Sequence, residues 1–305
     1  MSDLTASEET NVAIEYPALY TCADEASNQC QRAYLCLIRV EYLLLFIAAV
    51  LALNFDNSRA YFGFYTLVLG ASMAALIYRT AKKPEQDWYK CRALAESVKT
   101  ASWCYMMRAE PFSMASSSEA RSAFRDYIAD VLKANASLGA HIARRGSTDA
   151  QTTTSMNNIR ALRWEDRRQI YLDHRIKDQR DWYTRKAEFN RKRGNAWPWI
   201  SGVAYGVAIS LAVARVAWPE NIAAPLWPIG PLMVLASIVL GWTQVKKFNE
   251  LASVYALTDH EIGLVQEKIQ DVDLERELAP FVSEAELAFS REHTQWMARQ
   301  TKKFN

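Results

Sequence analysis

"YFGFYTLVLGASMAALIY", residues Tyr61–Tyr78, is a stretch of 18 residues without a charged side chain. A helix of this length extends about 27 Å, close to the roughly 30 Å hydrocarbon core of a bilayer. A helix of a soluble bundle normally keeps a polar stripe every three or four residues, and this stretch has none. The sequence therefore predicts a membrane-spanning helix here, in preference to a buried helix of a soluble protein.

Three further apolar stretches predict spans at about 36–55, 197–215 and 222–245. The first of them is long enough only if it includes Arg39 and Glu41, which we expect near the membrane surface, either paired or reaching into water. Because the connections within each pair of spans are short, we expect two transmembrane helical hairpins.

Basic residues gather at the open ends of both hairpins and are scarce in the turns. The basic residues at the open ends are Arg79, Lys82, Lys83, Arg191, Lys192, Arg193, Lys246 and Lys247. The positive-inside bias then places both chain termini and the stretch from about 80 to 195 in the cytoplasm, with the hairpin turns outside. The first 30 residues show no basic segment followed by an apolar run, so we expect no cleavable signal peptide.

The order of segments repeats as helix, hairpin, helix. We predict an all-α membrane protein in which long cytoplasmic helices form a bundle and the chains form an oligomer. The predicted parts are a polar segment 1–30, a first unit 31–146 with cytoplasmic helices 84–110 and 116–145, a linker 147–157, a second unit 158–280 with a basic helix 158–193 and a cytoplasmic helix 246–278, and an amphipathic helix 281–305. In this scheme Pro280 interrupts the preceding helix, and capping boxes at Ser116 and Ser283 start new ones.

Composition and motifs predict neither catalysis nor metal binding. The formal net charge of the 305 residues is +2, which excludes a generally basic nucleic-acid binder. The 5 cysteines form no C-x-x-C pair and the 4 histidines complete no metal-ligand spacing, so we expect reduced thiols, no metal and no cofactor. Phosphate-binding loops and nucleophile motifs are absent from the sequence. We therefore expect no enzyme and no catalytic residues.

The segment from Arg160 to Arg193 holds twelve Lys or Arg against six Asp or Glu. One interpretation is a solvated helix with pairs such as Asp181–Arg185, next to a basic collar at the membrane. The other is a basic surface for a phosphorylated ligand, from a nucleotide to an oligonucleotide. The candidate ligand-binding residues are Arg163, Arg167, Arg168, Arg175, Lys177 and Arg180.

One helical face after the first hairpin combines two indoles with three charges. The spacing of Trp88, Arg92, Glu96, Lys99 and Trp103 places all five on one side of a helix. Exposed intrahelical pairs stabilise by only a few tenths of a kcal/mol, too little to explain the pattern. We predict that this face is covered by the basic helix of the second unit or by a neighbouring subunit; the alternative is an accidental surface cluster.

Within the spans, small and weakly polar residues are the candidates for packing and for a pore. Gly202 and Gly206 form a G-x-x-x-G pattern, which would contact either the partner helix of the same hairpin or another subunit. The pore-lining candidates are Asn54, Thr66, Ser72, Ser210 and Arg215. Arg215 would favour anions at the outer mouth, unless it only reaches to the membrane surface.

The motif W-x-x-x-R-x-x-x-E-x-x-K-x-x-x-W-x-Y at 88–105, the E-P-F at 110–112 and the "DQRDWYTRKAEFNRKR" at 178–193 resemble the SLATT superfamily. These are the two-transmembrane effector domains associated with nucleotide-signalling defence systems of bacteria. The resemblance covers about residues 30–290, in a tandem four-helix arrangement. It implies a pore-forming effector that permeabilises the bacterial inner membrane when a nucleotide signal changes, with growth arrest or cell death as the result. The signal would come from a nucleotidyltransferase partner.

The first functional hypothesis is therefore a gated ion-conducting homo-oligomer, with a tetramer plausible, because four helices of one chain enclose no obvious aqueous path. The second is a membrane-anchored interaction scaffold without conduction. A transporter ranks last, since no span carries a buried carboxylate or a broken helix of the kind that couples ions. The expected partners are the lipid bilayer, further copies of the chain, and a nucleotide or oligonucleotide.

Overall fold

The computed structural model describes residues 13–142, 150–218 and 227–301, and all regular elements within these ranges are helices. Four of them are long and apolar enough to cross a membrane, which confirms the predicted all-α membrane protein. The residues outside the described ranges include 1–12 of the polar N-terminal segment, 143–145 of the helix predicted at 116–145, 146 at the end of the first unit, 147–149 of the linker, 222–226 of the fourth span and 302–305 at the end.

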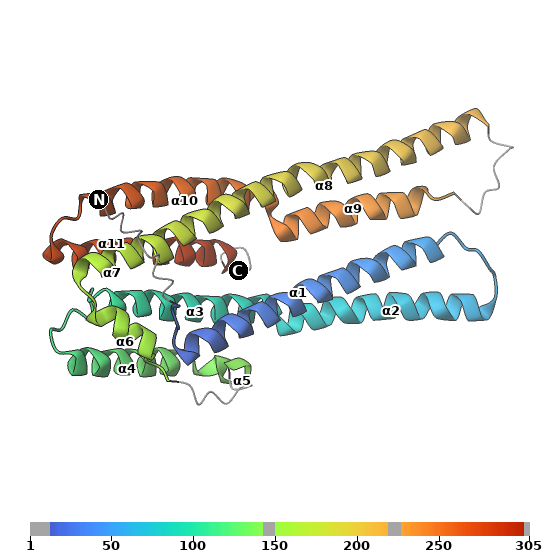
Figure 1. Ribbon diagram of the computed structural model, residues 1–305. Helices are drawn as coiled ribbons and strands as arrows, with labels where there is room; N and C mark the ends of the chain where they lie inside the picture. The colour runs from blue at the N-terminus through green and yellow to red at the C-terminus, as the bar shows by residue number, and fades with distance from the viewer. Residues whose placement is uncertain (1–12, 143–149, 219–226, 302–305) are drawn as a thin grey trace, which may run out of the picture. The chain divides into compact units, whose positions relative to one another are not determined.

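The described chain folds into two compact units (Figure 1), each assembled from separate stretches of sequence. Unit 1 comprises Met1–Asn28, Asp87–Arg175 and Glu267–Asn305, and unit 2 comprises Gln29–Gln86 and Ile176–Gln266. Unit 2 therefore holds both apolar hairpins together with residues 248–266 that follow the second, whereas unit 1 gathers helical segments from the start, the middle and the end of the chain.

Unit 2 is built on two antiparallel helical hairpins. In the first, α1 (Ala18–Leu51) lies beside α2 (Arg59–Lys82), and in the second α8 (Asp178–Ala217) lies beside α9 (Ile229–Lys246) (Figure 1). Ser58 caps the start of α2 by accepting a hydrogen bond from the backbone N–H of Tyr61.

A polar contact joins the two helices of each hairpin. Glu41, which the sequence places near the membrane surface, accepts hydrogen bonds from Nε and Nη2 of Arg79 at 2.9 and 3.3 Å. In the second hairpin, Oγ of Ser201 donates to the carbonyl oxygen of Ala236 at 3.2 Å. The first contact joins opposite charges and the second satisfies a buried hydroxyl, so each hairpin buries little unpaired polarity.

A glycine allows the two hairpins of unit 2 to approach each other. A Cβ atom at Gly241 of α9 would lie 2.6 Å from the hydroxyl oxygen of Tyr42 of α1, closer than a side chain permits. A larger residue at this position would displace the hydroxyl of Tyr42, so the small Gly241 allows the tyrosine of α1 to lie against α9.

The two hairpins end in the same backbone feature. Lys83 follows α2 and Lys247 follows α9, and both adopt the left-handed conformation, with φ of 44° and 50°. Their backbone N–H groups bond the carbonyl oxygens of Arg79 and Thr243, respectively. The chain then re-enters a helix at once, in α3 (Pro84–Met106) and in α10 (Phe248–Lys268). The chain thus leaves both hairpins through the same backbone conformation at a lysine.

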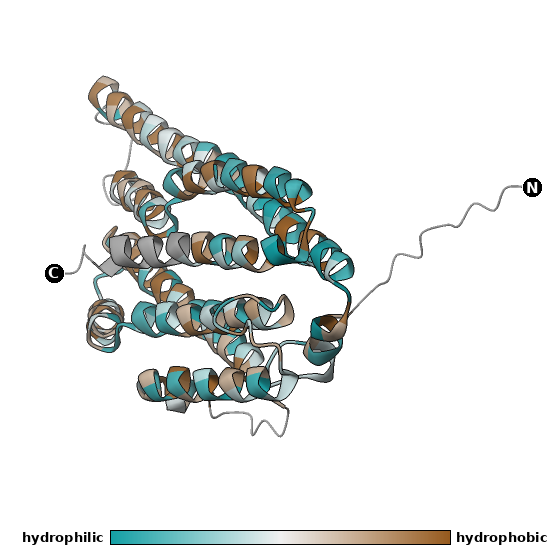
Figure 2. Ribbon diagram, turned by 90° about the vertical axis from the view of Figure 1, so that its left-hand side faces the viewer, coloured by the Kyte–Doolittle hydropathy of each residue, from teal (hydrophilic) through white to brown (hydrophobic). Residues whose placement is uncertain are grey.

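The core of unit 1 is centred on α3 and is rich in aromatic rings. The ring of Tyr105 lies 5.1 Å from that of Phe124, and Phe112 lies 5.4 Å from Phe124. Phe124 belongs to α4 (Ser117–Ala134), and Ser116 caps this helix by accepting from the N–H of Glu119, as its sequence motif predicts. Figure 2 shows hydrophilic and hydrophobic residues mixed along the helices, the pattern of amphipathic elements.

Several short elements and the long helix α11 complete unit 1. They are η1 (Ala136–Leu138), α5 (Gly139–Ile142), α6 (Thr154–Ala161), α7 (Trp164–Tyr171), the start of the π-helix η2 (Leu172–Lys177), η4 (Ile269–Asp271) and α11 (Glu275–Thr301).

Four helix predictions are wrong in detail. The helix predicted at 116–145 is broken after Ala134, where α4 ends and η1 and α5 follow. The helix predicted at 246–278 is interrupted between Asp271, the end of η4, and Glu275, the start of α11. The basic stretch 158–193 is not one α-helix, because α6 ends at Ala161, α7 begins at Trp164 and a π-helical stretch follows. The predicted break at Pro280 does not occur either, since α11 runs from Glu275 to Thr301 with Pro280 inside it. Ser283 caps no helix: its hydroxyl donates to the carbonyl of Ala279 and accepts the N–H of Glu110.

Candidate functional site

The charged part of the α3 face is covered by the first residues of α1 and by the segment before it. Arg92 donates to Asp24 at 3.1 Å and to Glu96 at 2.7 Å, and it thereby joins the two helices. The ammonium group of Lys99 lies 5.9 Å from the ring centre of Tyr16. These charges are therefore held within unit 1 and are not a random surface cluster of long side chains.

Trp103 is the anchor of this face and is fully buried. Its indole N–H donates to the hydroxyl of Tyr16 at 3.0 Å, and its ring meets Tyr171 edge to face at 5.5 Å. Tyr171 belongs to the basic stretch that we expected to cover this face. Trp88, by contrast, stacks on its neighbour Tyr89, with ring centres 4.7 Å apart. The described contacts of the face thus come from residues before the first hairpin, Tyr16 and Asp24, and from Tyr171 in the basic stretch.

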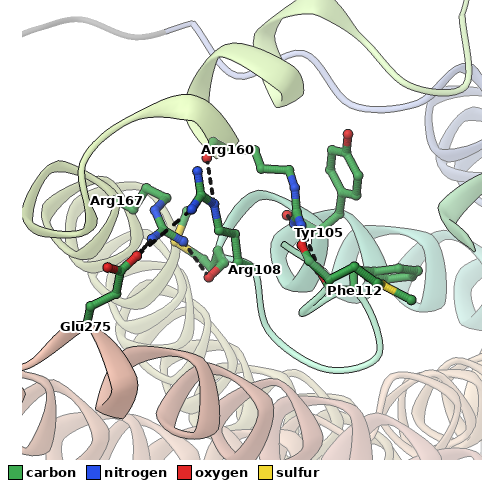
Figure 3. A network of polar contacts seen from close by, with 8 residues as sticks. Tyr105, Arg108, Phe112, Arg160, Arg167 and Glu275 are labelled. Atoms are coloured by element: carbon green, nitrogen blue, oxygen red, sulfur yellow. Dashed lines mark hydrogen bonds and ion pairs between the residues drawn. The ribbon is translucent and has the colours of Figure 1, made fainter. Parts of the chain in front are cut away.

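Arg160 holds the end of α3 in place (Figure 3). Its guanidinium donates to the carbonyl of Tyr105, and at 2.9 Å to the carbonyls of Phe112 and of Met114. The last carbonyls of a helix have no partner within the helix, so a cation at this position both satisfies them and complements the helix dipole. Burial lowers the pKa of Arg160 to about 10, and the nearby charges of Arg108 and Arg167 act in the same direction.

Arg167 and Arg168 extend this arrangement to the C-terminal part of the chain. Arg167 donates to the carbonyl of Met107 at 2.9 Å and to Glu275 at 2.8 Å, as Figure 3 shows. Arg168 donates to the carbonyl of Val272 at 2.6 Å. Arginines of one stretch thus connect the end of α3 with the beginning of α11.

A buried ion pair lies deeper in the same unit. Arg175 donates from Nε and Nη2 to the two carboxylate oxygens of Glu286 at 2.8 and 2.7 Å, and both side chains are 1% exposed. The hydroxyls of Tyr171 and Thr100 each donate to the same carboxylate at 3.0 Å. Four donors therefore surround one buried carboxylate, which is the kind of network that offsets its loss of hydration.

The electrostatics of this group follow from its burial. Burial opposes the charge of Arg175, but the carboxylate of Glu286 raises the pKa of Arg175 above its ordinary value. Burial and the same carboxylate raise the pKa of Tyr171 well above the ordinary value, so its hydroxyl stays a donor. Arg175 lies in the π-helix, an uncommon element that often marks functional sites. Its Nη1 has no hydrogen-bond partner among the described residues.

The structure distributes the six basic residues predicted to bind a ligand over both units. In unit 1, Arg163 is exposed and pairs with Glu165 at 2.9 Å, whereas Arg167, Arg168 and Arg175 are engaged as described above. In unit 2, Lys177 is exposed, and Arg180 pairs with Asp259 at 3.6 Å. The five arginines among the six therefore donate side-chain hydrogen bonds to other described residues of the protein. Their role toward a ligand stays a prediction.

The pore candidates of the first hairpin occupy different surroundings. Asn54 lies near the turn, with φ of 61° and its amide donating to Asn57. Thr66 donates its hydroxyl to the carbonyl of Phe62 in the preceding turn of its own helix. Ser72 is buried within unit 2. None of these contacts tests a pore, because the structure describes a single chain.

The candidates of the second hairpin lie on the exposed side of α8. Ser210 donates to the carbonyl of Gly206, and the guanidinium of Arg215 lies 5.7 Å from the ring of Trp227. A Cβ at Gly202 or Gly206 would meet no described atom within 4 Å, so neither glycine contacts α9. The interpretation of these glycines as the contact within the hairpin is wrong. The buried residues of α8 here are Ser201, Ala204 and Ala208, on the opposite side of the helix.

Several residues that build the site carry no signal in the sequence. Asp24, Glu275 and Glu286 look like ordinary helix charges, and Arg160 stands among many other cations. Their partners are 46 to 186 residues away along the chain, as in Arg160–Met114 and Thr100–Glu286. Among the described residues, no group of three His, Cys, Asp or Glu is placed to hold a metal ion.

Two family models match the chain one after the other. Residues 17–168 match SMODS and SLOG-associating 2TM effector domain 3, and residues 171–296 match SMODS and SLOG-associating 2TM effector domain 1. Neither a curated protein nor a solved structure gives a significant match. Each matched stretch contributes one hairpin to unit 2 and other helices to unit 1.

Proposed function

Because the chain belongs to the SLATT superfamily, with effector domain 3 followed by effector domain 1, we propose that it is a pore-forming effector of a bacterial anti-phage defence system. SLATT domains are membrane-type effectors associated with defence systems. In this proposal several copies surround an ion-conducting pore in the inner membrane, with both termini in the cytoplasm. Opening the pore depolarises the cell and leads to growth arrest or death.

The observation that carries the proposal is the outward apolar surface of both hairpins in unit 2. Leu67 of α2 is 67% exposed and Val216 of α8 is 84% exposed, and many other large apolar side chains of these helices are exposed too. Side chains of this kind require lipid or another chain as their solvent. Because each hairpin buries its own small residues inside, a water-filled path would form between chains.

Unit 1 would be the part that receives the signal. It collects basic residues on a rigid frame of buried arginines, and its exposed cations, such as Arg163, suit a nucleotide or oligonucleotide. Helix α1 contributes residues to both units, so a change in unit 1 would reach the first span through the chain itself. The nucleotide would come from a nucleotidyltransferase partner, and the protein itself would be no enzyme.

The test is the membrane potential after induced expression. We expect a potential-sensitive dye to report depolarisation before growth stops, and we expect the purified protein in a planar bilayer to give single-channel currents. Toxic expression at a normal membrane potential would contradict a pore. The same bilayer recording distinguishes the pore from the second candidate function. A membrane-anchored scaffold that recruits a cytosolic enzyme without conduction would give no current.

A further inference from the structure

Three cations from three helices meet at the open end of the hairpins in unit 2. Arg39 belongs to α1, Lys186 to α8 and Lys246 to α9. Burial lowers the pKa of Lys246, which follows the predicted span 222–245, and the charges of Arg39 and Lys186 lower it further. Arg39 and Lys246 contact the same ring of Trp242, and Lys186 lies close enough for its charge to act on Lys246.

Aromatic rings hold these cations instead of carboxylates. The guanidinium of Arg39 and the ammonium of Lys246 lie 5.4 and 5.7 Å from the ring centre of Trp242. Lys186 lies 5.7 Å from the ring of Trp182 and 6.0 Å from that of Phe189. Within the described residues none of the three cations forms an ion pair. Cation–ring contacts leave the positive charge uncompensated, so the group still lacks an anion.

Three other cations near the open ends of the hairpins have acidic partners. Arg79 pairs with Glu41, Lys192 with Glu188, and Lys247 with Glu250 at 2.9, 2.6 and 3.7 Å. Gathering three like charges without a counterion costs free energy, which grows when one of them is half-buried. The cluster of Arg39, Lys186 and Lys246 is therefore built to receive a negative group from outside the chain.

The position of the cluster indicates the kind of anion. Trp242 lies one turn before Lys246, as the indoles of membrane proteins commonly lie at the water–lipid boundary. Leu43 follows Arg39 by one helical turn toward the apolar part of α1 and is 58% exposed. A ligand that contacts both the three cations and Leu43 would need an anionic head and an apolar tail.

We propose that Arg39, Lys186 and Lys246 bind the phosphate of an anionic phospholipid in the cytoplasmic leaflet, with its acyl chains along Leu43. A zwitterionic phospholipid fits less well, because its ammonium group would meet three cations. The lipid would connect the first hairpin to the second at their cytoplasmic ends. The proposal rests on the orientation given under Proposed function, and it requires no conduction.

The experiment counts lipids on the full-length protein. The protein, purified in a nonionic detergent, is incubated with equal amounts of phosphatidylglycerol and phosphatidylcholine of the same acyl chains, and native mass spectrometry counts the bound lipids. We expect the protein to retain phosphatidylglycerol preferentially. The triple variant R39Q/K186Q/K246Q should retain at least about tenfold less, since each surface cation contributes on the order of 1 kcal/mol to anionic lipid binding.

The matched control is R32Q/K82Q/R185Q, which removes the same charge from exposed residues of α1, α2 and α8. Its preference for phosphatidylglycerol should stay within about twofold of the unmodified protein, with the same helical content by circular dichroism for all variants. If both triple variants lost the same amount of bound phosphatidylglycerol, the proposal would be overturned, because the loss would then follow from the change in net charge alone. A preference that survives in R39Q/K186Q/K246Q would do the same.

A third arm separates a lipid from a free phosphate. Inorganic phosphate at millimolar concentration should leave the bound phosphatidylglycerol in place, because it lacks the apolar contact. Displacement of the lipid by phosphate would overturn the assignment in favour of a soluble ligand. Lipid binding without any channel current would leave this proposal intact and contradict only the proposed pore.

Discussion

Arg175 and Glu286 are joined by two hydrogen bonds inside unit 1, although 111 residues separate them along the chain. Arg175 lies in the part of the chain that matches effector domain 1 and near its beginning, and Glu286 lies near its end. Thr100, from the part that matches effector domain 3, donates to the same carboxylate. One buried charge therefore binds both domains into a common core.

Removing one member of this pair should unfold unit 1 more readily. Glu286→Ala leaves the buried guanidinium of Arg175 without its counterion, and we expect a loss of about 3–5 kcal/mol in the free energy of unfolding. The double variant Arg175→Met, Glu286→Leu should recover most of the loss, because it removes both charges. Thermal unfolding of the full chain in detergent measures the stability of the single and the double variant.

The exposed pair Arg163–Glu165 is the control, and Arg163→Ala should cost less than about 1 kcal/mol. An equal loss in the single and double variants would contradict this account.

Arg160→Ala should loosen the end of α3. The substitution leaves the carbonyls of Tyr105, Phe112 and Met114 without their shared donor, and about 2–4 kcal/mol of stability should be lost. Hydrogen exchange of the amides in residues 103–114 should rise. Arg163→Ala, three residues away and exposed, should leave the exchange of this stretch unchanged, and a similar rise there would argue against a specific role of Arg160.

Lys83 and its neighbour Lys82 should respond to glycine with opposite signs. Lys83 has φ of 44°, a conformation that costs a non-glycine residue about 1 kcal/mol, so Lys83→Gly should raise the unfolding temperature. Lys82 is the last residue of α2 and has the helical conformation. Lys82→Gly should therefore lower the unfolding temperature, because glycine destabilises a helix by a free energy comparable to the strain at Lys83. Both variants lose one charge, so a difference between them reports the backbone alone. The same sign for both would exclude strain at Lys83 as the cause.

Gly206→Leu should weaken assembly without disturbing the fold of the single chain. A Cβ at this position meets open space, so the chain itself can accept the larger side chain. If the glycine face of α8 contacts another subunit, chemical crosslinking in membranes should show fewer oligomers. Gly70→Leu in α2 is the matched control, since Gly70 also faces open space. Unchanged crosslinking of Gly206→Leu would remove this face from the subunit interface.

The thiol of Cys104 should resist alkylation in the folded protein and report on the core. Burial, together with the charge of Glu286, raises the pKa of Cys104 to about 12. Ordinary thiols, with pKa near 8.5, become about tenfold more reactive between pH 7 and 8, because the thiolate is the reactive form. Cys104 should stay unmodified up to pH 9 and react only after unfolding. Peptide mass spectrometry after a maleimide pulse measures it, and rapid modification at pH 8 would contradict the buried environment.

The hairpins could be predicted from sequence because a membrane-spanning helix is recognisable from the composition of its own residues. A run such as Tyr61–Tyr78 has no charge anywhere around the helix, and no other part of the chain is needed to recognise it. The Ser116 cap was equally local, since donor and acceptor lie three residues apart. Predictions of this kind depend on neighbours in sequence, and the structure confirms them.

The buried core of unit 1 could not be predicted, because its contacts join distant residues. Ser283 and Glu286 have the spacing of a capping box, yet Glu286 binds Arg175 and Ser283 binds Glu110. Arg160 was indistinguishable from the other cations of its stretch, although it alone of them collects three carbonyls. Such partners become visible only when the helices are placed together.

The interlocked core of unit 1 has a consequence for how the protein can be divided. The border between the two family matches falls between residues 168 and 171, in the midst of the contacts made by Arg167, Tyr171 and Arg175. A cut there would separate Tyr171 and Glu286 from Trp103 and Thr100, so neither half would keep a closed interior. The two effector domains therefore share one interior, and we expect neither to fold as a separate fragment.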